Sequence, residues 1–143
     1  SYSLIPLVRY AKPQMSANAS VITMSYLGGQ RVVANYKLMG IAKAALESSV
    51  KYLAVDLGDR NIRVNSISLG PMRTLSGAAI KDARYIYNWS SKNSPLNRSV
   101  SFKDLQGASN YLLSGQSSGV TGEIHYVDVG YNLIGMIKPP KIS

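Results

Sequence analysis

With 143 residues, no cysteine and one histidine, the chain can form neither a disulfide nor a metal site of several histidines, and the lack of cysteine suits a cytoplasmic location. The hydrophobic content of 45% is typical of a globular protein, and no apolar run approaches the roughly 20 residues that a membrane-spanning helix needs. The net charge is +9, but the sixteen Lys and Arg residues are dispersed and no basic stripe is interleaved with aromatic residues, which argues against a nucleic-acid partner.

The chain begins with a predicted helix over residues 1–14, in which apolar residues recur at helical spacing. No basic segment precedes an apolar core here, so we do not expect a signal peptide. A loop over residues 16–20 leads into a predicted buried strand over residues 21–24. Ser25 and Tyr26 leave the carboxyl end of that strand, where open parallel sheets bind their ligands, so we expect chemistry there.

A long helix is predicted over residues 35–57, with Gly58 and Asp59 ending it. Tyr36 and Lys43 should share one face of this helix, because seven residues bring the side chain back to within roughly 20° of its start. A phenol can donate a proton to a developing oxyanion, and a nearby cation favours the ionised phenol and can hold a ligand hydroxyl. Such a pair also occurs as a half-buried ring beside a solvated charge. The predicted apolar face of the helix comprises Leu38, Ile41, Ala42, Ala45, Leu46, Val50, Leu53 and Val55.

A second strand is predicted over residues 62–67, where apolar and polar residues alternate, and Gly70 and Pro71 break it. The segment 71–74 then lies just past the carboxyl end of this strand. Two strand ends that are each followed by polar residues predict one shared cleft. Taken alone, Gly70 and Pro71 would indicate only an ordinary turn without a functional role. One or two short helices are expected over residues 75–91.

The last part of the chain contains one more helix and one more strand. Ser101 and Asp104 resemble a capping box that opens a helix to about residue 113. A strand is predicted over residues 122–127, and His125 within it is expected to be structural. The alternation of helices and strands predicts an α/β fold with a parallel sheet. No repeat or linker divides residues 1–143, so we predict a single unit. Three strands make a thin sheet, and no G-x-G-x-x-G loop follows an early strand, so the fold looks as if its first half were absent.

Three features together resemble the bacterial enoyl-[acyl-carrier-protein] reductases, a divergent branch of the short-chain dehydrogenase/reductase superfamily. They are Tyr36 with Lys43 seven residues later, Tyr26 ten residues before Tyr36, and the segment SLGPMRT at residues 68–74. The resemblance extends from residue 1 to about residue 136. It implies the C-terminal, catalytic part of a Rossmann-like doubly wound parallel sheet without its N-terminal nucleotide-binding half. Ketoacyl and alcohol reductases of the superfamily use Tyr-x-x-x-Lys instead, and Gly40 stands at that lysine position here.

The resemblance also implies a reaction, in which hydride from NADH reaches the β-carbon of a trans-2-enoyl thioester. Tyr36 would contact the thioester oxygen and stabilise the enolate, Lys43 would bind the nicotinamide ribose, and Tyr26 would act as a second active-site residue. Further cofactor contacts would come from Met72, Arg73, Thr74, Leu75 and Ser76. The acyl pocket would be lined by Tyr26, Tyr36, Met39, Ile80 and Ala83.

The partners that the resemblance implies are an acyl carrier protein, which carries the substrate, and three further subunits of a full-length homotetramer. Lys81 and Arg84 would lie near the portal where the acidic carrier docks, although a solvated helix face is the more ordinary explanation for them. The helices over residues 1–14 and 35–57 would meet across a subunit interface. Departures from the family pattern occur at Ala34, Leu69, Asn97 and Val129, the last replacing a small residue after Asp128.

A second hypothesis is that the chain is a truncated, catalytically inactive fragment. Without the first half, the adenosine and phosphate sites would be missing. The strand over residues 21–26 would then present an unpaired edge, which favours aggregation.

Overall fold

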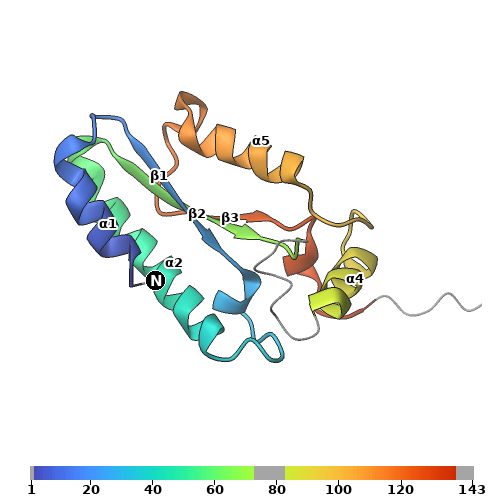
Figure 1. The fold of residues 1–143 in the computed structure, drawn as a ribbon. Helices are drawn as coiled ribbons and strands as arrows, with labels where there is room; N and C mark the ends of the chain where they lie inside the picture. The colour runs from blue at the N-terminus through green and yellow to red at the C-terminus, as the bar shows by residue number, and fades with distance from the viewer. Residues whose placement is uncertain (1, 73–82, 138–143) are drawn as a thin grey trace, which may run out of the picture.

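A three-stranded parallel sheet forms the middle layer of the fold. The computed structural model describes residues 2–72 and 83–137. The strands β1 (Ser20–Ser25), β2 (Arg63–Leu69) and β3 (Ile124–Val127) lie in the order β1-β2-β3. Figure 1 shows α1 and α2 on one face of the sheet and α5 on the other, while α4 lies beyond the carboxyl ends of the strands. The predicted α/β class and the parallel sheet are therefore confirmed.

The helices follow the predicted order, with short 3-10 turns between them. Their bounds are α1 (Leu4–Ala11), η1 (Lys12–Gln14), η2 (Leu27–Gly29), α2 (Leu38–Leu57), η3 (Gly58–Arg60), α4 (Ala83–Asn93), α5 (Phe102–Leu113), η4 (Gly115–Ser117) and η5 (Tyr131–Leu133). The predicted helices over residues 75–91 fall partly on residues 73–82, which lie outside the described residues. The capping box of α5 is confirmed, since the Ser101 hydroxyl accepts from the amide of Asp104 and the Asp104 carboxylate accepts from the amide of Ser101.

The middle strand, β2, is buried on both faces because a helical layer covers each side. Its polar side chains are consequently hydrogen-bonded, as burial requires. Asn65 donates to the carbonyl of Val120 at 2.9 Å and accepts from the amide of Glu123 at 3.0 Å. These bonds fix the entry of β3 beside β2, and the register then pairs Ser66 with Ile124.

The hydrophobic core lies between the sheet and the helices α1 and α2. It consists of Val8, Val50, Leu53, Ala54, Leu57, Ile62 and Val64. The predicted apolar face of α2 is only partly confirmed. Leu46, Val50 and Leu53 are buried, whereas Leu38, Ile41 and Val55 are 78%, 68% and 80% exposed. Helical periodicity identifies which residues share a face but not whether that face meets the sheet, so it did not separate the buried apolar residues of α2 from the exposed ones.

The predicted start of the long helix was wrong, for a reason that lies in the backbone, whereas its predicted end at Leu57 is confirmed. Asn35 and Lys37 have φ values of 65° and 43°, which a right-handed helix excludes, so α2 begins only at Leu38. Tyr36 therefore lies in a turn ahead of the helix. At the other end, Gly58 keeps a helical φ of −59° and the chain continues into η3, where Asn61 supplies the left-handed residue with φ 56°.

Replacing Val129 by glycine is expected to stabilise the protein. Val129 has a φ of 54°, a left-handed conformation that is strained for a β-branched residue and unstrained for glycine. Relief of this strain should exceed the extra chain entropy of glycine and raise the free energy of unfolding by about 1 kcal/mol. Urea denaturation measures the change, and Val129→Ala is the control because it keeps a Cβ in the same conformation. Equal or lower stability of Val129→Gly would contradict this account of the strain.

Candidate active site

The carboxyl ends of all three strands carry the candidate site residues. Tyr26 follows β1 directly, Met72 lies three residues beyond β2 and is partly exposed, and Tyr131 follows β3 in η5. The turn before Tyr131 is held by the buried carboxylate of Asp128, which accepts from the amides of Gly130 at 3.0 Å and Asn132 at 2.7 Å. This arrangement agrees with the expectation that ligand-binding residues lie beyond the carboxyl ends of the strands.

Tyr26 and Tyr36 form an edge-to-face aromatic pair. Their ring centroids are 5.0 Å apart and the ring planes cross at 65°. The close approach depends on Gly28, because a Cβ at that position would lie 2.4 Å from Cδ1 of Tyr36. The loop that follows β1 therefore carries Tyr26, and its Gly28 forms the floor against which the ring of Tyr36 packs.

Both phenols keep their protons at neutral pH. Burial, followed by the neighbouring Tyr131 and Tyr36, raises the pKa of Tyr26 to about 12. Burial also raises the pKa of Tyr36. Sequence analysis expected a nearby lysine to favour the ionised form of Tyr36, but burial decides the direction in this structure, and the raised pKa keeps the phenol protonated. Each hydroxyl is available as a hydrogen-bond donor to a substrate oxygen.

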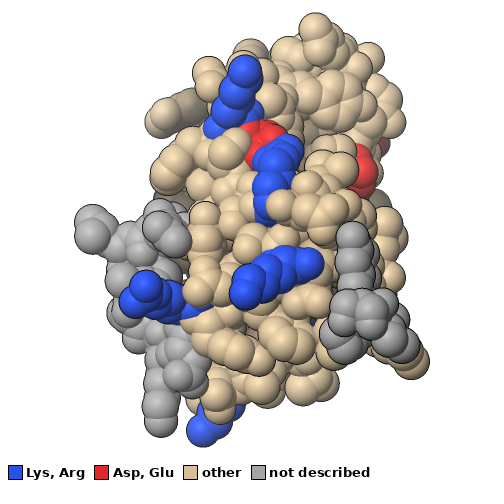
Figure 2. Space-filling view, turned by 90° about the vertical axis from the view of Figure 1, so that its right-hand side faces the viewer, with Lys and Arg blue, Asp and Glu red and all other residues tan. Residues whose placement is uncertain are grey.

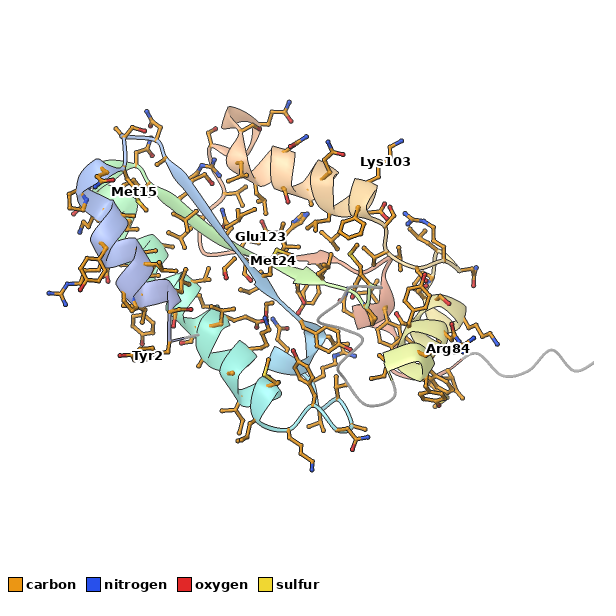
Figure 3. The ribbon with its side chains drawn as sticks, viewed as in Figure 1. Tyr2, Met15, Met24, Arg84, Lys103 and Glu123 are labelled. Carbon is orange, nitrogen blue, oxygen red and sulfur yellow. The ribbon has the colours of Figure 1, made fainter. Side chains whose placement is uncertain are left out.

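Lys43 is anchored to the end of β1 from the second turn of α2. Its Nζ donates to the carbonyl oxygen of Met24 at 2.7 Å, and Figure 3 labels Met24 on β1. Burial lowers the pKa of Lys43, while Glu47 one turn further along α2 opposes that effect. An ammonium has three donors, so this bond leaves two for a ligand. Because Tyr36 precedes α2, a shared helical face does not explain the placing of Tyr36 and Lys43.

An apolar cavity of about 410 Å³ lies between Tyr26 and α4. Its aromatic walls are Tyr26, Tyr131, Tyr85 and Trp89, of which the last two stack with centroids 5.7 Å apart. Sequence analysis did not identify Tyr85, Trp89 or Tyr131. Only Tyr131 carried a usable signal, since it follows the carboxyl end of the last predicted strand.

The remaining predicted pocket and cofactor residues are only partly brought together. Tyr36 lines a neighbouring groove of about 330 Å³ with Val33 and Gly40, and Met39 is exposed and lines neither cavity. Ala83 is the first residue of α4. Other predicted residues lie outside the described part of the chain, namely Arg73, Thr74, Leu75, Ser76 and Ile80.

Activity should be lost on the alkaline side through Lys43 rather than through the tyrosines. The ammonium carries the donors, so deprotonation above its pKa removes them, and a lowered pKa moves that loss to below the ordinary value of 10.5. The raised pKa values of Tyr26 and Tyr36 keep both phenols protonated across the same range. A pH profile of kcat/KM for the full-length protein containing this chain measures the pH at which activity falls on the alkaline side. Lys43→Arg should move this fall to higher pH. If the fall stays at the same pH in Lys43→Arg, another group causes it.

Within the described ranges, no helix combines the length and apolar character needed to span a membrane. Three or more potential metal ligands do not gather anywhere in the same part of the chain.

Comparison with known proteins gives a consistent set of relatives. A family model described as Enoyl-(Acyl carrier protein) reductase matches residues 1–132. The enoyl-[acyl-carrier-protein] reductase [NADH] 2 of Rhizobium meliloti is 53% identical over 135 residues, which are 94% of this chain and 50% of that protein. The Rickettsia typhi enoyl-[acyl-carrier-protein] reductase [NADH] FabI is 51% identical over 137 residues, which are 96% of this chain and 52% of the relative.

Solved structures agree with these sequence relatives. FabI from Candidatus Liberibacter asiaticus superimposes with a TM-score of 0.92 at 53% identity, covering 96% of this chain and 53% of the other. A reductase from Anaplasma phagocytophilum, solved in complex with NAD, gives 0.91 at 49% identity with the same coverage. The chain thus spans about half the length of the relatives that it matches, and the prediction of a partial Rossmann-like sheet is confirmed.

Proposed function

This chain belongs to the enoyl-(acyl carrier protein) reductase family, and from that premise we propose that it supplies the catalytic part of an NADH-dependent enoyl-[acyl-carrier-protein] reductase of fatty acid biosynthesis. The reaction is reduction of a trans-2-enoyl thioester at its β-carbon. The observation that carries the proposal is the protonated pair of Tyr26 and Tyr36 near the carboxyl end of β1, of which Tyr26 lines the apolar cavity and Tyr36 the neighbouring groove.

The phenols provide the stabilisation that this reaction needs. Addition of hydride to the β-carbon moves an electron pair through the conjugated system onto the thioester oxygen, giving an enolate. A hydrogen bond from Tyr36 to that oxygen strengthens as the charge develops, so it lowers the barrier more than it stabilises bound substrate. Tyr26, whose ring contacts that of Tyr36, fixes its orientation and lines the acyl cavity. A proton from the solvent then adds to the α-carbon of the enolate and completes the saturated product.

Lys43 fits a nicotinamide nucleotide, which supplies the hydride when it is bound. The ammonium is held at the carboxyl end of β1 by the carbonyl of Met24. Its two remaining donors suit the neighbouring hydroxyls of a ribose. Of the further cofactor contacts proposed, Met72 is the one within the described residues and lies just past β2. The others, at residues 73–76, remain predictions.

An acyl carrier protein would approach from the side of α4. Figure 2 shows this side of the molecule, where Lys and Arg side chains are more abundant than acidic ones. Arg84 is exposed at the start of α4, the helix that contributes Tyr85 and Trp89 to the cavity wall (Figure 3). An excess of positive charge at a portal would attract an acidic carrier and speed its association. Lys81 lies outside the described residues, so its place near the portal stays a prediction.

The full-length protein is proposed to be a homotetramer that uses the outer face of α1 and α2. Tyr2, Tyr10, Tyr52 and Val55 are large side chains that stay exposed on these two helices or beside them. An apolar face of this kind is typical of a subunit contact. Size-exclusion chromatography with light scattering of the full-length protein tests this proposal, and a monomer would contradict it.

The 143 residues alone are proposed to be inactive. β1 pairs with β2 alone in the described sheet, so its other edge is open to aggregation. The chain also matches only about half of each NADH-dependent relative. Turnover of an enoyl thioester with NADH by the isolated chain would refute this proposal.

The test of the function uses the full-length protein and two substrates. We expect NADH to be consumed with a crotonyl thioester and not with an acetoacetyl thioester, because the tyrosine and lysine are spaced as in the enoyl reductases. Preference for the acetoacetyl thioester would favour the alternative, a ketoacyl reductase of the same superfamily.

A further inference from the structure

Glu47 is a buried carboxylate to which the proposed mechanism assigns no task. Its side chain points from α2 toward the loop after β1, and the residue is only 5% exposed. Removing a carboxylate from water is costly unless hydrogen bonds replace the lost hydration. The partners that supply those bonds therefore show what the carboxylate holds in place.

Each oxygen of Glu47 accepts a hydrogen bond from the segment around Tyr26. The Ser25 hydroxyl donates to Oε1 at 2.5 Å, and Nε2 of Gln30 donates to Oε2 at 3.1 Å. The Tyr126 hydroxyl in turn donates to Oε1 of Gln30, so the network also reaches β3. Ser25 and Gln30 each present a hydrogen toward the carboxylate, which accepts both bonds. An amide in place of the carboxylate could keep both bonds only if the Ser25 hydroxyl turned round to accept one.

The positions of these partners link Glu47 to the candidate active site. Ser25 immediately precedes Tyr26, and Gln30 closes the loop whose Gly28 lies under the ring of Tyr36. Gly29 leaves room for the carboxylate, since a Cβ there would lie 2.9 Å from Oε1 of Glu47. On its own helix, Glu47 is one turn from Lys43, and its charge raises the pKa of that lysine against the effect of burial.

We propose that Glu47 is a positioning residue, which holds residues 25–30 against α2 and so fixes Tyr26 and the floor under Tyr36 relative to Lys43. This inference rests on the proposed function, because it assigns the residue to the same site. Glu47 does not touch the substrate in this scheme. It acts through the loop, and misplacement of a reacting group by about 1 Å can reduce turnover by as much as 10²-fold.

The test compares Glu47→Gln with Asp56→Asn in the full-length protein containing this chain. Both variants replace one carboxylate of α2 by an amide of the same shape, but Asp56 is exposed. Glutamine at position 47 loses the charge and must turn its NH₂ group either toward Ser25, whose hydroxyl then gives up the bond that it donates, or toward the NH₂ group of Gln30. We expect Glu47→Gln to reduce kcat about tenfold with the KM of the thioester changed less than twofold, as for a group that acts on positioning. Asp56→Asn should match the parent protein.

Two further readouts separate positioning from general stability. In a Tyr36→Phe background, Glu47→Gln should cause less than a twofold additional loss of kcat, because the hydroxyl that Glu47 helps to place is already absent. In the single variant Glu47→Gln, hydrogen exchange should be about tenfold faster than in the parent protein at the amides of Gly29, Gln30 and Arg31, which donate to the carbonyls of Tyr26 and Leu27 within the loop. Exchange in β2 should be unchanged. If the parent protein reduces no enoyl thioester, the proposed function fails, while the exchange measurement still decides this inference. Unchanged exchange in the loop overturns it, as does a multiplicative loss of kcat in the double variant.

Discussion

Tyr36→Phe is expected to reduce kcat for an enoyl thioester by about 10²–10³-fold in the full-length protein, because it removes the donor that meets the developing oxyanion. The phenyl ring keeps its edge contact with Tyr26 and its place over Gly28, so the fold and the affinity for NADH should change little. Steady-state kinetics measures kcat, and fluorescence titration with NADH measures the affinity.

The control for this variant is Tyr52→Phe, which removes the same hydroxyl from an exposed tyrosine of α2. It should retain the parent kcat. A Tyr36→Phe protein that binds NADH normally and keeps kcat within threefold would exclude Tyr36 as the oxyanion donor. Tyr26, the neighbouring protonated phenol, would then be the candidate for that role.

Lys43→Met is expected to weaken NADH binding by about 10–100-fold, since hydrogen bonds from a charged donor contribute roughly 1.5–3 kcal/mol each. Methionine keeps most of the apolar stem and removes the ammonium that bonds to Met24. The dissociation constant of NADH and its KM should rise together, because the lost contact is made before the chemical step.

The matched variant is Lys51→Met, which removes a lysine from the exposed side of the same helix and should leave NADH binding unchanged. Loss of kcat in Lys43→Met without any change in NADH affinity would show that the lysine acts on the chemical step and not on the nucleotide.

The strands and their carboxyl ends could be predicted from the sequence because each depends on a short local pattern. Residues 21–24, 62–67 and 122–127 all lie within or overlap the three observed strands. Tyr26 was placed correctly after β1 for the same reason. The capping box of α5 is likewise local, and its two reciprocal hydrogen bonds are present.

The features that could not be predicted depend on backbone strain or on contacts between distant segments. The late start of α2 follows from positive φ values at Asn35 and Lys37, and lysine is not a residue that suggests such a conformation. The aromatic wall formed by Tyr85 and Trp89 depends on how α4 lies over the strand ends. Glu47 sits in a helical pattern like any surface glutamate, and only the fold shows that it is buried against Ser25.

The measurement that tests the central claim most directly uses NADH deuterated at the transferable position of its nicotinamide ring. The full-length protein containing this chain would reduce a crotonyl thioester with this cofactor, and NMR of the product would locate the deuterium. We expect one deuterium at the β-carbon and none at the α-carbon, with the signal appearing about 10²–10³-fold more slowly in Tyr36→Phe. A product without deuterium at the β-carbon, or unchanged transfer in Tyr36→Phe, would contradict enoyl reduction by this site.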